Sequence, residues 1–197
     1  MFTESADEQY GILNPFIQDG LDSGDEVLTI VDDAFRGAHA ERLQGSGIPV
    51  DETLASGQLR ILASEDTYGR DGTFAAERMY ALLEEVLETS AEGQWDWLRV
   101  IGDASWVLRT MQGSDELMAY EAKVNLLAPR HACTLLCVYD INQCSGQVIA
   151  DAMATHSHLI MGGRLLQNPH YMDPLEFLKK VALRRARSTP LTVPTGA

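Results

Sequence analysis

Short runs of apolar residues alternate with longer stretches whose apolar residues recur at helical spacing, and this alternation constrains the fold most. Continuous apolar runs are typical of strands that are buried on both faces, as in parallel sheets covered by helices. The sequence therefore predicts an α/β domain with three layers, a mostly parallel sheet with helices on both faces. The predicted strands are Glu26–Val31, Leu59–Leu62, Leu98–Gly102, Cys133–Tyr139 and His158–Gly162. The Cys133–Tyr139 run is the most apolar, which predicts a central place in the sheet.

Capping residues mark the predicted helices. Ser5 is followed three positions later by Glu8, which fits a capping box, and Gly20 and Gly24 are expected to end the helix that follows. Its apolar positions recur at helical spacing, which predicts a stripe that faces inward. Further helices are expected over Arg36–Leu43, from a Thr73 cap, around Ser105–Arg109, over Ser114–Leu127, from a Ser145 cap to Met153, and after Asp173.

Length and composition favour one domain. A chain of 197 residues suits a single domain, which we expect over residues 1–187. Residues 188–197 contain Pro190 and Pro194 and are predicted to form a flexible tail.

The charge balance excludes several partners. The net charge is −14, from 15 basic and 29 acidic residues, so direct nucleic-acid binding is not expected. The chain has no run of about 20 apolar residues that could span a bilayer. Residues 1–9 carry acidic side chains and no basic one, unlike a signal peptide, so a cytoplasmic location is expected.

The sequence gives little support for catalysis. The chain has no Gly-Lys pair, so it lacks the phosphate-binding loop of the P-loop NTPases. A Gly-x-Ser-x-Gly motif is also absent, and Ser105 is interpreted as a helix cap. We therefore expect no catalytic residues and no enzyme activity. A nucleotide-binding enzyme with an unusual site stays open as an alternative.

Metal binding and cofactors are not predicted either. The cysteines number three, and no histidine follows Cys133 and Cys137 at a zinc-finger spacing. His156 and His158 lie two positions apart and could be joined by His170, but such a pair is a weak signal without a third ligand at a clear spacing.

The strand ends suggest a different kind of site. Ligands of open parallel sheets bind outside the carboxyl ends of the strands. A crevice there would be rimmed by aromatic rings with two polar side chains beside them, which suits a small organic ligand. The residues concerned are Tyr68, Trp106, Tyr139, Tyr171, Asn168 and His156.

Four stretches, over residues 7–33, 56–87, 120–140 and 154–178, resemble the MEDS domain, a sensory domain type of methanogen and methylotroph proteins and the DcmR regulator. Cys-x-Tyr-Asp, Thr-His and Asn-Pro-x-Tyr occur in this order at 137–140, 155–156 and 168–171. The resemblance implies a RecA/KaiC-like fold without a P-loop and the sensing of small hydrocarbon-derived molecules. The positions that match the family pattern, and so the implied ligand-binding residues, are Trp106, Cys137, Tyr139, Asp140, His156, Asn168 and Tyr171.

Two departures from the family pattern have consequences. Only Met1–Glu4 precede the first helix, so the family's first strand is expected to be missing. Ser157 stands where the family has proline after the histidine. No output module is recognised, so we expect a stand-alone sensory domain that signals to a regulatory protein partner, a kinase or transcription regulator, through a mobile Gly162–Pro174 loop.

The rival hypothesis is a ligand-free interaction or oligomerisation module on a degenerate RecA-like scaffold. In that case the apolar stripe of the Asp7–Gly24 helix would form a contact between subunits of a homo-oligomer.

Overall fold

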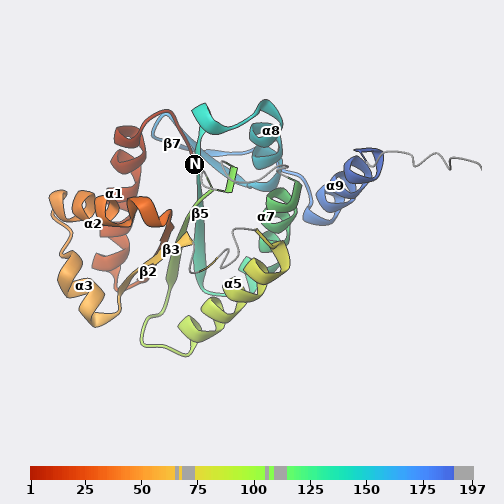
Figure 1. Ribbon diagram of the computed structural model, residues 1–197. Coiled ribbons are helices and arrows are strands. Elements are labelled where there is room, and N and C mark those ends of the chain that lie inside the picture. The colour runs from red at the N-terminus through yellow and green to blue at the C-terminus, as the bar shows by residue number, and fades with distance from the viewer. Residues whose placement is uncertain (65–66, 68–73, 105–106, 109–114, 189–197) are drawn as a thin grey trace, which may run out of the picture.

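The computed structural model describes residues 1–64, 67, 74–104, 107–108 and 115–188. Its centre is a five-stranded sheet in the order β1-β5-β4-β2-β3, and every neighbouring pair is parallel. The three-layer α/β fold is therefore confirmed (Figure 1). The strands are β1 (Phe2–Thr3), β2 (Glu26–Val31), β3 (Leu59–Ala63), β4 (Leu98–Asp103) and β5 (Cys133–Asp140).

Helices cover both faces of the sheet (Figure 1). One face carries α1 (Ala6–Ser23), α2 (Arg36–Gly45) and α3 (Val50–Ser56), with the 3-10 turn η1 (Asp33–Phe35) leading into α2. The other face carries α5 (Ala76–Ala91), α7 (Asp115–Leu127) and α8 (Gly146–Thr155), with α9 (Pro174–Ser188) packed against α7 and α8. Two further 3-10 turns, η2 (Ala128–Arg130) and η3 (Ile141–Gln143), flank β5.

Alternate residues of each strand enter different apolar cores. Val27 packs toward α1, α2 and α3, whereas Leu28 and Ile30 pack toward α5 and α7. Successive side chains of a strand point to opposite faces, and both faces are covered here. This is why the strands read as continuous apolar runs.

Helix α1 begins and ends where its capping residues predict. The hydroxyl of Ser5 accepts a hydrogen bond from the Glu8 amide at 3.2 Å, and Gly24 closes the helix with φ of 81°. Leu13, Ile17 and Leu21 are buried in the core between α1 and the sheet. The apolar stripe of α1 is thus already covered, so the expectation that it forms a subunit contact is wrong.

The structure corrects one strand prediction and refines another. Contrary to the expectation, a short strand does precede the first helix: β1 pairs with β5 through Phe2 opposite Tyr139 and Thr3 opposite Asp140. The β5 strand is an interior strand, paired with β4 on one side and with the short β1 on the other, and β4 is the middle strand of the five.

The predicted fifth strand forms a separate hairpin. β6 (His158–Met161) pairs antiparallel with β7 (Arg164–Gln167) and does not join the parallel sheet. Gly162 and Gly163 connect them with φ of 53° and 69°, the left-handed backbone that a two-residue hairpin turn requires. The chain therefore reverses at once, whereas a parallel strand would need a crossover connection. Residues 164–167 of the expected mobile loop are thus part of a strand.

Several predictions lie outside the described residues. These are the Thr73 cap, the helix around Ser105–Arg109 except for residues 107 and 108, the rings of Tyr68 and Trp106, and residues 189–197 of the predicted tail. Within the described part of the chain, no helix combines the length and apolar character that a membrane span requires.

Candidate functional site

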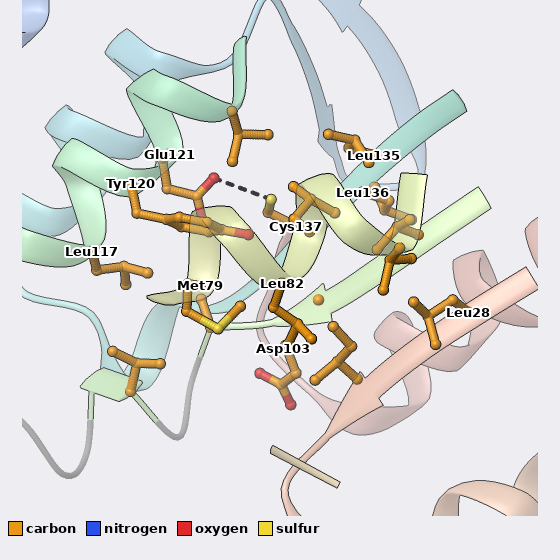
Figure 2. Close-up of a pocket in the computed structure, with 18 of the residues that line it drawn as sticks. Leu28, Met79, Leu82, Asp103, Leu117, Tyr120, Glu121, Leu135, Leu136 and Cys137 are labelled. Atoms are coloured by element: carbon orange, nitrogen blue, oxygen red, sulfur yellow. Dashed lines mark hydrogen bonds between the residues drawn. The ribbon is translucent and has the colours of Figure 1, made fainter. Parts of the chain in front are cut away.

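A cavity lies between the sheet and helices α5 and α7 (Figure 2). Its volume is about 50 Å³. The chain runs from β2 to β3 on one side and then returns to β4 and β5 on the other, so the strand order reverses between β2 and β4. Ligands of open α/β sheets bind at such a reversal point. Leu28 and Ile30 of β2, with Val100 and Asp103 of β4, contribute to the lining at this point.

The lining is mostly aliphatic. Among the described lining residues only Phe74 and Tyr120 carry aromatic rings, and none is a lysine or arginine. The expected crevice rimmed by rings depends in part on Tyr68 and Trp106, which lie outside the described residues, so it stays a prediction. Tyr139 is not among those lining residues, because its ring packs against Phe2 with centroids 5.5 Å apart. The polar side chains among the described lining residues are those of Tyr120, Asp103, Glu121 and Cys137.

Glu121 of α7 is the centre of a buried polar cluster at one end of the cavity. Its Oε2 accepts a hydrogen bond from the Cys137 thiol at 3.3 Å, and its Oε1 accepts one from the Tyr139 hydroxyl at 3.1 Å. Cys137 and Tyr139 are two positions apart on β5 and so share the face that α7 covers. Figure 2 shows Glu121 and Cys137 pointing toward each other from the helix and the strand.

His156, at the end of α8, completes the cluster. Its Nδ1 lies 2.7 Å from the carbonyl oxygen of Ala152, and its Nε2 lies 3.7 Å from Oε2 of Glu121. The ring meets Tyr139 edge-on, with centroids 5.8 Å apart. The side chains of His156 and Glu121 are only 18% and 5% exposed, so water screens their interaction weakly.

Burial and the Glu121 carboxylate set the protonation states. Burial raises the pKa of the Cys137 thiol and of the Tyr139 phenol well above their usual values, and the charge of Glu121 adds to both shifts. Both groups are therefore neutral donors at physiological pH. Burial also lowers the pKa of His156, while Glu121 acts in the opposite direction.

Comparison with known proteins identifies the family. The family model "MEthanogen/methylotroph, DcmR Sensory domain", abbreviated MEDS, matches residues 1–157. The chain belongs to the MEDS family. As a MEDS domain it has a sensory, regulatory role. The match ends one residue before the β6–β7 hairpin.

Two known proteins resemble this MEDS domain. The transcriptional repressor DcmR of Methylorubrum extorquens is 28% identical over 144 residues, which are 72% of this chain and 51% of the repressor. The chain thus spans about half the length of that relative. The crystal structure of the flagellar accessory protein FlaH from Methanocaldococcus jannaschii matches with a TM-score of 0.52 and 15% identity. That match covers 83% of this chain and 72% of FlaH, and it supports the RecA-like fold.

The structure brings together three of the residues that the MEDS resemblance implies. Cys137, Tyr139 and His156 all surround Glu121. Asp140 follows them on β5 but turns to the surface, where it accepts hydrogen bonds from Asn142 and Gln143.

The remaining implied residues have other surroundings. Asn168 donates to the backbone carbonyls of Met153 and His156 and so anchors the hairpin to α8. Tyr171 is 37% exposed. Trp106 lies outside the described residues.

Sequence reasoning missed Glu121. The signal was its position, four residues after Leu117 and three before Val124, both buried on the inner side of α7. A carboxylate at helical spacing within a buried stripe must have polar partners. His156 and His158, which the sequence offers only as a weak candidate pair, do not come together, since His158 is exposed and contacts the Ser157 hydroxyl instead.

Proposed function

We propose that this MEDS domain binds a small, mostly apolar organic molecule in the cavity between the sheet and helices α5 and α7. The observation that carries the proposal is an aliphatic cavity at the reversal point of the sheet, with Glu121 and Cys137 at one end. Apolar cavities with a few convergent polar groups suit small organic ligands. In this proposal the domain binds its ligand and carries out no chemical step on it.

The cavity limits the size of the ligand. Its volume of about 50 Å³ is well below the ~150 Å³ of an engineered apolar cavity that holds benzene. We therefore expect a molecule smaller than a benzene ring, with an apolar body and at most one polar group. Such a group would face Glu121 or Cys137, the polar residues at one end of the lining.

The charges at the site support this ligand class over a nucleotide. The ionisable residues among the described lining are the acidic Asp103 and Glu121, together with Cys137 and Tyr120. Asp33 lies in the first turn after β2, where a phosphate-binding loop would need backbone amides and a cation. Carboxylates at these positions would repel a triphosphate.

Helix α7 offers a path from the ligand to a protein partner. Leu117, Glu121 and Val124 line the cavity, and Asp115 at the start of the same helix pairs with Arg184 of α9. A ligand that favours one position of α7 would therefore shift α9 as well. A regulatory partner that binds α9 would then respond to the ligand.

Exposed apolar side chains suggest where that partner binds. Leu165 of β7 is 69% exposed and Leu183 of α9 is 61% exposed. Exposed apolar side chains of this kind also fit the rival interpretation, a ligand-free interaction module. The two differ in whether the cavity accepts a ligand, and a binding experiment distinguishes them.

The proposal is tested by thermal unfolding in the presence of xenon and of alcohols and haloalkanes with one or two carbons. A molecule that occupies the cavity should raise the unfolding temperature in a concentration-dependent way, since only the native state binds it. The variant Val100→Phe, which fills the cavity, should abolish that rise. A lack of any rise across the whole series would contradict the proposal.

The matched control is Ile101→Phe. Ile101 is the next residue of β4, but it packs in the opposite core, toward α1. Both variants overpack the same strand and should cost about 1–3 kcal/mol of stability. Only Val100→Phe should lose the response to the probe.

A further inference from the structure

We propose that Glu121, Cys137 and His156 form a binding site for a divalent transition-metal ion, Zn²⁺ in the first instance. This site goes beyond the proposed ligand binding and does not depend on it. Each residue offers one ligand atom, and these atoms all lie within 4.8 Å of one another.

The distances between the ligand atoms fit a tetrahedral metal. Zinc lies about 2.3 Å from a thiolate sulfur and about 2.0–2.2 Å from nitrogen or oxygen, so neighbouring ligand atoms are about 3.3–3.5 Å apart. Oε2 of Glu121 is 3.3 Å from Sγ of Cys137 and 3.7 Å from Nε2 of His156. Small side-chain adjustments would suffice for all three to reach one ion.

The surroundings of the ligands are those of a metal site. A metal-binding histidine donates its other ring N–H to a carbonyl or carboxylate, which fixes the ring and its tautomer. The Nδ1 of His156 lies 2.7 Å from the Ala152 carbonyl, so this N–H has its acceptor and the Nε2 lone pair faces Glu121. The second oxygen of Glu121 is held by the Tyr139 hydroxyl. Both ligands are thus oriented by groups behind them.

Charge provides an independent argument. In the neutral ring with its proton on Nδ1, the lone pair of Nε2 faces the buried carboxylate of Glu121. A cation there would relieve this repulsion. Glu121 and a Cys137 thiolate together carry two negative charges, which balance a divalent ion in a site of low dielectric.

Residue chemistry selects the kind of metal. One thiolate, one imidazole and one carboxylate are typical zinc ligands, whereas calcium and magnesium take oxygen ligands only. Three protein ligands leave a fourth position open. Because Glu121 and Cys137 also line the cavity, the ion would border the space that we assign to the organic ligand.

The test uses the full chain after treatment with EDTA. Zinc is titrated against a competing chelator, and Co²⁺ is added in a parallel sample as a spectroscopic probe. We expect one high-affinity equivalent of Zn²⁺, and with Co²⁺ a thiolate-to-metal charge-transfer band. The absence of that band in the unmodified protein overturns the proposal.

Amino-acid substitutions test which side chains bind the metal ion. Cys137→Ser, Glu121→Gln and His156→Gln should each weaken Zn²⁺ binding by more than about tenfold. The matched controls are Cys133→Ser, on the same strand, and His158→Gln, two positions after the ligand histidine; both should bind as the unmodified protein does. Equal affinity in all five variants would place the bound zinc elsewhere and overturn the proposal.

Folding of the variants is checked separately. Each is unfolded thermally with excess EDTA and again with Zn²⁺. The unmodified protein and both controls should gain thermal stability from zinc, because the ion binds only the native state. The three ligand variants should gain little. If the unmodified protein gains nothing, the proposal is wrong whatever the variants do.

Discussion

The hydroxyl of Tyr139 donates a hydrogen bond of 3.1 Å to the Glu121 carboxylate, and this bond joins the sheet to helix α7. Both side chains are buried. Tyr139 also pairs with Phe2, so the same ring links β1, β5 and α7. Any displacement of α7 by a ligand must strain or break this bond.

Tyr139→Phe should therefore destabilise the protein. The change removes a donor from a buried carboxylate and leaves the ring packing intact, so the expected loss is about 1.5–3 kcal/mol. Urea unfolding measures it. Tyr171→Phe is the control, because Tyr171 is partly exposed and its change should stay within about 0.5 kcal/mol. Equal losses of unfolding free energy in the two variants would show that the hydrogen bond of Tyr139 does not stabilise the native protein.

His39 predicts a pH dependence of stability. Its side chain is buried on α2, its Nδ1 lies 2.8 Å from the Tyr10 hydroxyl of α1, and its Nε2 has no hydrogen-bond partner among the described residues. Burial lowers its pKa from 6.5 to about 4.

Between pH 6.5 and about 4 the unfolded chain therefore binds a proton at His39 that the native protein does not. The stabilisation is complete above pH 6.5 and is lost as the pH falls toward 4, by at most about 3 kcal/mol. Urea unfolding across this range should show a shallower slope for His39→Leu than for the unmodified protein. His170→Gln should keep the original slope. An unchanged slope in His39→Leu would show that His39 does not cause the pH dependence of stability.

Arg184 should control the docking of α9. It pairs with Asp115 of α7 and, at 2.7 Å, with the fully buried carboxylate of Asp151 on α8. The Nζ of Lys180 also lies 3.6 Å from Oδ1 of Asp151. Basic residues of α9 thus pair with acidic side chains of both α7 and α8.

Arg184→Ala should loosen α9, because a buried carboxylate loses its closest cation. Hydrogen exchange of the amides in Pro174–Ser188 should become at least about tenfold faster, while β2 and β4 keep their protection. The control is Arg187→Ala, three residues further along the same helix, where no change is expected. Unaltered exchange in Arg184→Ala would show that the ion pairs of Arg184 do not hold α9 against α7 and α8.

Most of the fold could be predicted because burial on both faces leaves a clear pattern. Val27 and Leu28 enter opposite cores, so their strand is apolar at every position. The β1 strand has two residues, too few for any pattern. The His158–Met161 run has the composition of a sheet strand, and only the two glycines after it indicate a hairpin.

Less of the candidate site could be predicted. Cys137, Tyr139 and His156 were named from the family resemblance, but Glu121, which they surround, was not. A glutamate on a helix is usually exposed, and its partners on β5 come 16 and 18 residues later. Only the packing of α7 against β5 brings them together. Asn168 was named as a ligand-binding residue, yet in the structure its amide holds the hairpin.

The central claim, that the cavity between the sheet and α5 and α7 is the ligand site, is tested most directly by methyl NMR. The methyl groups of leucine and valine are labelled, and their shifts are followed while the small alcohols and haloalkanes are added. The account predicts perturbation of Leu28, Val100 and Leu117, which line the cavity, and none of Leu13, Leu43 and Val138 in the opposite core. Shifts confined to the opposite core, or no shifts with any member of the series, would contradict it.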